Sequence, residues 1–209
     1  MSLFIVFEGG EGCGKSTQTR ALCRHLSRDG FQVVLTREPG GTRLGERVRR
    51  YLKQTNETPI SPLAELFLIA TARAQLVSEV IRPALKQKRT VICDRFTPST
   101  LAYQGYGRGL DMDALREVND IATDGLVPDL IVLLDIPVED GLNRKKSKES
   151  DRFESESVAF HTRVRRGYQK MAKADPKRWL VVDGRLPRKA IEKKVWERVG
   201  ILLRRESHA

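Results

Sequence analysis

The sequence predicts an α/β fold, a doubly wound sheet of about five parallel strands with helices on both faces. Three observations lead to this: short apolar runs alternate with helical patterns, the runs are apolar throughout, and a glycine-rich turn joins the first run to the first helix. Strands that are apolar throughout are buried on both faces, as in a parallel sheet covered by helices. The intervening helices would supply the crossover connections that parallel strands require.

Five runs rich in apolar and β-branched residues are expected to form the strands. In chain order they are Leu3-Phe4-Ile5-Val6-Phe7, Val33-Val34-Leu35, Val91-Ile92-Cys93, Leu130-Ile131-Val132-Leu133-Leu134 and Trp179-Leu180-Val181-Val182. Ligands of such a sheet bind beyond the carboxyl ends of its strands. The residues that follow each run are therefore the first place to look for function.

Helical patterns fill the intervals and the C-terminal part of the chain. They lie near 15–28, 44–54, 63–88, 111–124, 155–173 and 187–204. Pro83, inside the third pattern, predicts a kink or a register break, because proline cannot donate the helical hydrogen bond. The charged stretch 143–154 separates two helical patterns and is expected to be an irregular surface segment.

Length and composition favour one domain over residues 1–209, because the chain can bury a sizeable core and shows no internal repeat or linker. Its cysteines, Cys13, Cys23 and Cys93, have neither disulfide nor zinc-site spacing. The first strand begins at once, leaving no room for a signal peptide, and no apolar run approaches the ~18 residues of a membrane span. We expect a cytoplasmic protein that does not bind membranes.

The net charge of +11 fits either a nucleic-acid surface or an enzyme whose substrates carry many phosphates. The basic residues are spread over several segments and form no low-complexity tail. No helix–turn–helix or RNA-recognition signature is present. Charge alone therefore does not decide between the two classes.

The segment Gly9-Gly10-Glu11-Gly12-Cys13-Gly14-Lys15-Ser16-Thr17 follows the first predicted strand and leads into the first predicted helix. It matches the phosphate-loop pattern G-x-x-x-x-G-K-[ST], whose backbone N–H groups and helix N-terminus bind an anion. Lys15 would reach the β- and γ-phosphates, and the Ser16 hydroxyl would ligate Mg²⁺. The alternative is a strand-to-helix turn without a ligand. The pattern in this context predicts binding of a nucleoside triphosphate.

Charged residues follow three of the other strands. Arg37-Glu38 ends the second, Asp94-Arg95 the third and Asp135 the fourth. An acid beside a phosphate loop can hold a metal's hydration shell, and a neighbouring arginine can clamp a phosphate with two hydrogen bonds. Asp94 and Asp135 both qualify, and we favour Asp94 because Arg95 beside it can clamp a second substrate. The alternative for this pair is a structural salt bridge.

Several motifs in order resemble those of bacterial thymidylate kinases, over about residues 3 to 200. They are the phosphate loop, Thr36-Arg37-Glu38-Pro39-Gly40-Gly41-Thr42, Asp94-Arg95-Phe96, Ala102-Tyr103-Gln104-Gly105 and Asp151-Arg152-Phe153-Glu154. The resemblance implies transfer of the γ-phosphoryl group of ATP to dTMP, giving dTDP and ADP on the route to dTTP. It also implies Mg²⁺, a phosphate-loop fold with a short lid at 143–154, and a homodimer packed through long helices. ATP and dTMP would be the partners, with no nucleic acid.

The resemblance also implies roles for individual residues. Residues Gly9 to Thr17 would bind ATP, and Glu11 would lie near the 3′-hydroxyl of the acceptor. Glu38 and Asp94 would act near the metal and the transferred group, with Ser16 and Asp94 as metal ligands. The residues around the acceptor would be Arg37, Arg49 and Arg95 at its phosphate, Arg73 at the thymine carbonyl, Thr100 and Gln104 along the base, and Tyr103 against a 2′-hydroxyl.

Gly12 further resembles the subtype in which the lid carries the catalytic cations. Here these would be Arg144, Lys145, Lys146, Lys148 and Arg152. We name Arg144 and Arg152 as the catalytic candidates and leave the choice between them open; either could instead bind the adenine nucleotide. A cation over the γ-phosphate stabilises the charge that develops during transfer. The alternative is a solvated run of charge.

One position departs from the family pattern, which has a stacking Phe four residues before the base-reading Arg. Four residues before Arg73 stands Ile69, and Phe67 lies six before. A separation of four keeps two side chains on one helix face and a separation of six does not. Either Ile69 packs against the base without stacking, or the helix is locally distorted so that Phe67 takes its place. The alternative for Phe67 is a core residue, and we favour that alternative. The apolar face Leu63, Leu66, Phe67, Ala70 and Ala74 is either part of a dimer contact or core.

Two other functions remain open at this stage. One is a kinase for another nucleoside monophosphate, and the other is a phosphate-loop ATPase that acts on DNA. Cys13 also allows two readings. The loop and Lys15 could lower the pKa of its thiol and make it the most reactive cysteine, or its sulfur could fill space behind the loop.

Overall fold

The computed structural model describes residues 2–54, 59–145 and 151–206. Its five-stranded sheet has the order β2-β3-β1-β4-β5, and all neighbouring strands run parallel. The strands are β1 (Phe4–Glu8), β2 (Val33–Arg37), β3 (Thr90–Asp94), β4 (Leu130–Asp135) and β5 (Trp179–Asp183). Each predicted run is therefore a strand, and all five strands extend into a charged residue at their carboxyl end.

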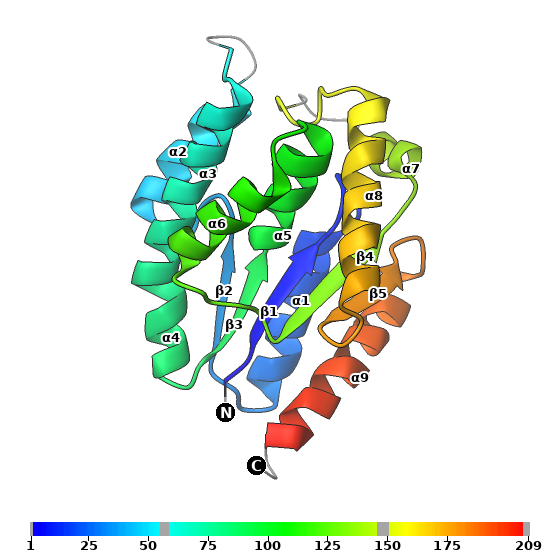
Figure 1. Ribbon diagram of the computed structural model, residues 1–209. Coiled ribbons are helices and arrows are strands. Elements are labelled where there is room, and N and C mark those ends of the chain that lie inside the picture. The colour runs from blue at the N-terminus through cyan, green and yellow to red at the C-terminus, as the bar shows by residue number, and fades with distance from the viewer. Residues whose placement is uncertain (1, 55–58, 146–150, 207–209) are drawn as a thin grey trace.

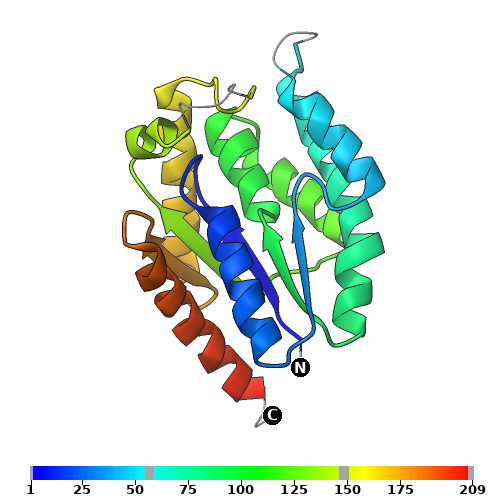
Figure 2. The same cartoon turned by 180° about the vertical axis from the view of Figure 1, so that it is seen from behind.

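Helices cover both faces of this sheet (Figures 1 and 2). They are α1 (Lys15–Arg28), α2 (Arg43–Lys53), α3 (Pro62–Leu76), α4 (Arg82–Lys86), α5 (Thr97–Thr100), α6 (Met112–Thr123), α7 (Val138–Asn143), α8 (Val158–Ala174) and α9 (Arg188–Glu206), with two π-helical segments, η1 (Val77–Ile81) and η2 (Leu101–Gly107). Among the described residues, no helix has both the length and the apolar content needed to span a bilayer.

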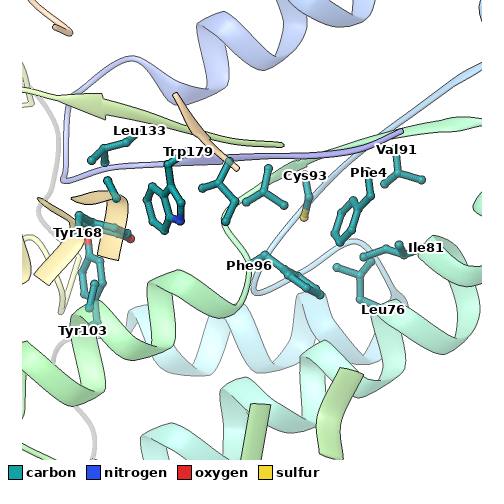
Figure 3. Packing of buried hydrophobic residues seen from close by; sticks show 14 of the residues in the cluster. Phe4, Leu76, Ile81, Val91, Cys93, Phe96, Tyr103, Leu133, Tyr168 and Trp179 are labelled. Atoms are coloured by element: carbon teal, nitrogen blue, oxygen red, sulfur yellow. The ribbon is translucent and has the colours of Figure 1, made fainter. Parts of the chain in front are cut away.

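Two hydrophobic clusters lie on opposite faces of the sheet. Phe4, Val91 and Cys93 face one cluster. Side chains of the helical stretch from Pro62 to Lys86, of η2 and of α8 complete this cluster (Figure 3). Ile5 and Ile92 face the other, which is formed with α1 and α9. Alternate residues of one strand thus enter opposite clusters, which explains why the strands are apolar throughout.

The predicted break at Pro83 is confirmed. The helical region from Pro62 to Lys86 changes to π-helix at Val77–Ile81, and Pro83 lies in the first turn of α4. Proline has no N–H to donate and its ring crowds the carbonyl four residues back. A wider turn before it relieves this conflict without ending the helical path.

Two helical segments were not predicted from the sequence. One is α5 with η2, and the other is α7. Two glycines in η2 conceal its helical pattern in the sequence. Both allow close packing, because a Cβ on Gly105 would meet Met112 Sδ at 2.5 Å, and a Cβ on Gly107 would meet the Phe160 ring at 2.6 Å. These glycines are thus required by helix packing rather than by a loop.

Candidate functional site

A cavity of about 400 Å³ opens at the carboxyl ends of the strands. It brings together the phosphate loop, the ends of β2 and β3, one face of α3, η2 and the lid. Of the predicted site residues it is lined by Glu11, Gly12, Cys13, Gly14, Lys15, Ser16, Thr17, Arg37, Glu38, Arg49, Ile69, Arg73, Asp94, Arg95, Thr100, Tyr103, Gln104 and Arg144. Gly9, Gly10 and Arg152 are the predicted residues that do not line it.

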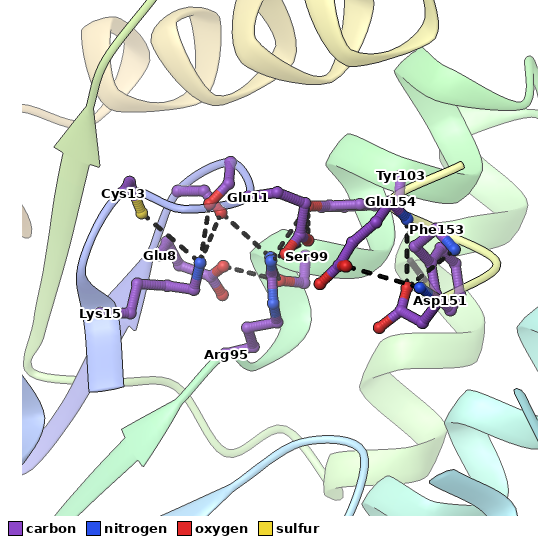
Figure 4. A network of polar contacts seen from close by, with 12 residues as sticks. Glu8, Glu11, Cys13, Lys15, Arg95, Ser99, Tyr103, Asp151, Phe153 and Glu154 are labelled. Carbon is purple, nitrogen blue, oxygen red and sulfur yellow. Dashed lines mark hydrogen bonds and ion pairs between the residues drawn. The ribbon is translucent and has the colours of Figure 1, made fainter. Parts of the chain in front are cut away.

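The phosphate loop has the geometry that its sequence pattern predicts. Gly14 caps α1 in the left-handed region, with φ 96°, and no side chain caps the first N–H groups of the helix. The Lys15 ammonium donates to the carbonyls of Gly9 and Gly10 at 3.1 and 2.9 Å and is held inside the loop (Figure 4). Uncapped N–H groups and a lysine therefore face the cavity, where a phosphate chain would bind.

Ser16 and Asp94 meet across the sheet edge. The Ser16 hydroxyl donates to Asp94 Oδ2 at 2.6 Å. Among the described residues, no three His, Cys, Asp or Glu side chains are grouped so that they could hold a metal ion by themselves. This hydroxyl and carboxylate fit Mg²⁺, which is bound by few protein oxygens and completes its shell with phosphate oxygens and water. Asp135, the other acid considered, is instead held by Arg165 at 2.7 Å and by Gln169.

Cys13 packs behind the loop. Its side chain is 1% exposed and belongs to the hydrophobic cluster with α1 and α9. Its sulfur lies 3.5 Å from the Lys15 ammonium. Burial removes the access that a reactive thiol needs, so the space-filling reading holds and Cys13 is not the exposed cysteine. Cys23 is the most accessible of the three, and burial raises the pKa of the Cys93 thiol well above its ordinary value.

Arg37 and Arg49 both line the cavity. Arg37 pairs with Glu46 at 3.0 Å, whereas Arg49 makes one hydrogen bond, to the Pro39 carbonyl at 3.0 Å. Burial and the charge of Arg37 lower the pKa of Arg49. A phosphate dianion bound beside Arg49 would relieve the repulsion that Arg49 experiences from Arg37.

Arg95 turns back toward the phosphate loop. Its φ of 75° is rare for a residue other than glycine, and it brings the guanidinium to Glu11 at 2.6 Å and to the Tyr103 hydroxyl at 3.0 Å. Tyr103 also donates to Glu11 at 2.8 Å. Burial would raise the pKa of Glu11, but the charges of Arg95, Lys15 and Lys145 outweigh it and hold the pKa far below its ordinary value.

Arg73 makes hydrogen bonds to several segments around the cavity. It is 1% exposed and pairs with Glu38 at 2.7 Å. It also donates to Thr100 at 2.9 Å, to Asn119 and to the Phe96 carbonyl. These partners account for all the N–H groups of a guanidinium, so Arg73 must exchange one contact before it can donate to a base. Burial raises the pKa of Glu38, and its Oε1 has no partner among the described residues.

The expectation that Phe67 is a core residue is wrong. Phe67 is 53% exposed on the outer face of α3, while Ile69 is buried and lines the cavity. The physical reason is the helical separation between the two, which turns them to different faces. Phe153, an aromatic residue of the lid, lines the cavity as Ile69 does and packs against the hydrophobic cluster that contains Ile69. Its ring meets the edge of Tyr103 with centroids 6.0 Å apart.

The lid cations reach different targets. Lys145 pairs with Glu11 at 3.1 Å and with Glu154, so it stands beside the phosphate loop. Arg144 lines the cavity and donates to the Gly184 carbonyl at 3.1 Å. Arg152 instead donates to the Leu52 carbonyl at 3.0 Å and to Glu65, away from the loop. Lys146 and Lys148 lie outside the described residues.

Gly12 contacts the helix that leads into the lid. A Cβ on Gly12 would overlap the carbonyl oxygen of Gly141 in α7, and a Cβ on Gly141 would overlap the Glu11 carbonyl. An arginine at position 12 cannot be accommodated while α7 packs here. This contact gives a structural reason why position 12 carries no side chain.

Sequence reasoning named neither Glu8 nor Glu65 as a site residue and gave Phe153 no role. Glu8 ends β1, is buried, and accepts from the Phe96 N–H at 2.8 Å and from Ser99 and Tyr168. Burial raises its pKa. A carboxylate at the end of an apolar strand was a signal for Glu8, since such a group needs buried donors. Glu65 and Phe153 had no comparable signal, because only folding brings their partners to them.

Comparison with known proteins identifies relatives of nearly the same length. The family model described as thymidylate kinase matches residues 7–195. A thymidylate kinase of Dehalococcoides mccartyi (strain ATCC BAA-2266 / KCTC 15142 / 195) is 53% identical over 204 residues, which cover 98% of this chain and 99% of the relative. One of Nostoc sp. (strain PCC 7120 / SAG 25.82 / UTEX 2576) is 48% identical, with 96% and 97% covered.

A solved structure shares the fold. The crystal structure of thymidylate kinase from Ehrlichia chaffeensis superposes with a TM-score of 0.78 at 35% identity, covering 95% of this chain and 98% of that one. The parallel sheet, the phosphate loop and the cavity at its edge therefore occur together with near-full-length similarity in sequence and structure. The chain belongs to the thymidylate kinase family.

Proposed function

We propose that the protein transfers the γ-phosphoryl group of ATP to dTMP, giving dTDP and ADP, a step of dTTP synthesis. The observation that carries this proposal is one cavity with two anion sites: the phosphate loop on one side and Arg37 with Arg49 on the other. A kinase must hold a donor phosphate chain and an acceptor phosphate close together, because phosphoryl transfer depends on positioning and charge stabilisation. Family membership supports the same reaction.

On the donor side, residues Gly9 to Thr17 would bind the phosphates of ATP. Lys15 would leave the Gly9 and Gly10 carbonyls to reach the β- and γ-phosphates. Ser16 and Asp94 would hold Mg²⁺, which neutralises phosphate charge when bound. Asp94 accepts a hydrogen bond from Ser16 already, so both oxygens lie within reach of one ion.

On the acceptor side, Arg49 and Arg37 would bind the phosphate of dTMP. Arg95 would add a third cation, because its guanidinium contacts Gly9 and Glu11 of the phosphate loop and lines the same cavity. Glu11 and the Tyr103 hydroxyl would face the sugar, where their short contact leaves no room for a 2′-hydroxyl. Glu38, buried with an unpartnered oxygen beside Arg73, would accept a hydrogen bond from the substrate or from ordered water.

The base would lie between Ile69 and Phe153. Both side chains line the cavity together with Arg73, Thr100 and Gln104, the residues expected along the base. An aliphatic side chain supplies contact area but no stacking, whereas a phenyl ring supplies both. Phe153 would thus provide the aromatic face that Ile69 lacks.

For the cation at the transition state, Lys145 and Arg144 are the better supported lid residues. Lys145 contacts Glu11 of the phosphate loop and Arg144 lines the cavity. Arg152 anchors the lid to α2 and α3 instead. We therefore favour Arg144 of the two candidates that the sequence left open, with Lys145 added beside it.

We also propose that residues 1–209 form a single kinase domain that acts in the cytoplasm as a homodimer. Leu63 and Phe67, each 53% exposed, line the outer face of α3 with Ala70 and Ala74. Leu66, expected on the same face, is buried and belongs to the interior. Two large exposed apolar side chains one turn apart favour contact with a second copy.

A coupled assay with ATP and each monophosphate in turn tests the reaction. We expect ADP formation that depends on dTMP, is far slower with dCMP, dAMP and dGMP, and is lost in the Lys15→Ala variant. Another preferred acceptor would replace the substrate assignment. ATP hydrolysis that DNA stimulates and dTMP does not would contradict the proposal and favour a DNA-dependent ATPase.

A further inference from the structure

Glu65 is a fully buried carboxylate outside the phosphate-binding machinery. It lies on α3, is 0% exposed and accepts hydrogen bonds from three side chains of two other segments. Gln104 Nε2 donates to Oε1 at 2.6 Å, and Arg108 donates to Oε2 at 3.1 Å. Arg152 of the lid donates to Oε2 as well. A buried charge is costly unless it is paired and hydrogen-bonded, and two guanidinium groups meet that need here.

The contact with Gln104 determines which end of that amide faces the cavity. A carboxylate oxygen only accepts, so it binds the amide N–H and repels the amide carbonyl. Gln104 is 1% exposed and lines the cavity. Its Oε1 accepts no hydrogen bond from any residue that the structure describes. The amide carbonyl and the second N–H of Nε2 therefore remain for a ligand, and the carbonyl requires a donor.

A pyrimidine base offers either a donor or an acceptor at N3. Thymine and uracil carry an N3–H between two carbonyls, whereas cytosine carries an unprotonated N3 that only accepts. We propose that Glu65 is a positioning residue: it orients Gln104 so that Oε1 accepts the N3–H of the acceptor base, and it thereby discriminates against cytosine. The proposal rests on the proposed function, in which dTMP is the acceptor.

Arg108 and Arg152 keep this orientation rigid. Arg108 bridges Glu65 and Glu156 and lies over the Phe160 ring, and Arg152 joins Glu65 to the lid. Glu65 cannot rotate away from Gln104 without leaving a guanidinium unpaired in a partly buried site. The same carboxylate thus serves base recognition and anchors the lid segment that bears Phe153.

The test compares Glu65→Gln with wild type for three acceptors and one analogue. A neutral amide at position 65 can donate to Gln104 Oε1, so Gln104 is free to turn over. We expect the ratio of kcat/KM for dTMP over dCMP to fall about tenfold, mainly through KM for dTMP. The ratio for dTMP over dUMP should not change, because both bases carry N3–H. The penalty for N3-methyl-dTMP relative to dTMP should shrink.

Glu156→Gln is the matched control. It makes the same chemical change at the other carboxylate of Arg108 but does not contact Gln104, so the ratio for dTMP over dCMP should stay at the wild-type value. If Glu65→Gln does not fold, Glu65→Asp keeps the charge, shortens the reach to Gln104 and should lower the same ratio. Unchanged ratios in a folded variant, or an equal fall for all acceptors through kcat, would overturn the proposal. Wild type that does not phosphorylate dTMP would instead overturn the proposed function.

Discussion

At the scale of single residues, the acceptor-side arginines differ in the contacts that each already makes. Arg37 is paired with Glu46, and Arg95 contacts Glu11 and the Gly9 carbonyl of the phosphate loop. Arg49 has one hydrogen bond, to a backbone carbonyl. Removing Arg95 would therefore disturb both substrates, whereas removing Arg49 isolates the acceptor phosphate.

Arg49→Ala should raise KM for dTMP by about ten- to a hundredfold with little change in ATP affinity, since a charge-assisted hydrogen bond contributes about 1.5–3 kcal/mol. Steady-state kinetics with each substrate varied, together with ATP titration, measure this. Arg50→Ala, an exposed neighbour on the same helix, is the control and should behave like wild type. Equal loss of ATP and dTMP affinity would show that Arg49 is structural.

Phe153→Ala should raise KM for dTMP about tenfold, because stacking and buried ring area would be lost from the base site. The added change Ile69→Phe should restore much of the affinity by placing a ring elsewhere in the cavity lining. Measuring KM and kcat for the single and double variants distinguishes this from damage to the lid. If kcat alone falls and Ile69→Phe restores nothing, Phe153 does not contact the base.

At the scale of elements, the phosphate loop and α7 are joined by two glycines whose backbones nearly touch. Gly12 has φ 66° and faces the Gly141 carbonyl, so the loop cannot move far without moving the helix that leads into the lid. Phosphate binding and lid position are thus coupled by packing. Neither glycine has a side chain that could give way, so the contact tolerates no added volume.

Gly12→Ala should destabilise the protein by about 2–4 kcal/mol, because backbone strain and steric overlap add together. Gly30→Ala separates the two causes: Gly30 also has a positive φ, 85°, but a Cβ there meets nothing within 4 Å. Thermal unfolding should show the larger loss for Gly12→Ala. Equal losses in both variants would mean that strain alone matters and that α7 does not press on the loop.

At the scale of the whole molecule, we propose that the outer face of α3 forms the contact between two copies of the chain. Phe67→Glu should convert the proposed dimer into a monomer, because a charge cannot be buried unpaired at an apolar interface. Val181→Glu is the control. Val181 is 54% exposed, close to the 53% of Phe67, but it lies on β5, an edge strand of the sheet, and not on α3. Sedimentation velocity measures both. A monomeric wild type would contradict the proposed dimer, and a dimeric Phe67→Glu would place the interface elsewhere.

Stability should depend on pH with opposite sign at two neighbouring carboxyl groups. The pKa of Glu11 is lowered on folding, so it stabilises the fold above its unfolded value of 4.5, and this is lost as the pH falls below 4.5. The pKa of Glu8 is raised by burial, so its contribution is complete below 4.5 and is lost as the pH rises through the folded pKa.

Thermal unfolding at pH 7 and below 4.5 tests this. The deficit of Glu11→Gln relative to wild type should shrink as the pH falls, while Glu8→Gln should improve relative to wild type as the pH rises. Parallel curves for both variants would show that neither carboxyl group changes its pKa on folding.

The sequence by itself determined the strands, the phosphate loop, the break at Pro83 and most of the cavity lining. These features depend on local pattern: apolar runs, glycine spacing, and charged residues placed where strands must end. The family resemblance rested on the same local motifs, and the comparisons confirm it.

Tertiary structure alone decided which side chains meet. In the folded chain Phe67 is exposed and Cys13 is buried. Phe153 packs against the cluster that contains Ile69, Arg152 donates to Glu65 rather than to the phosphate loop, and Glu65 accepts a hydrogen bond from Gln104. Each outcome depends on partners far away in the chain, and a helical face or a lid residue carries no local mark of which partner it will contact. Local spacing limits where a residue can point, but packing against distant segments determines what it touches.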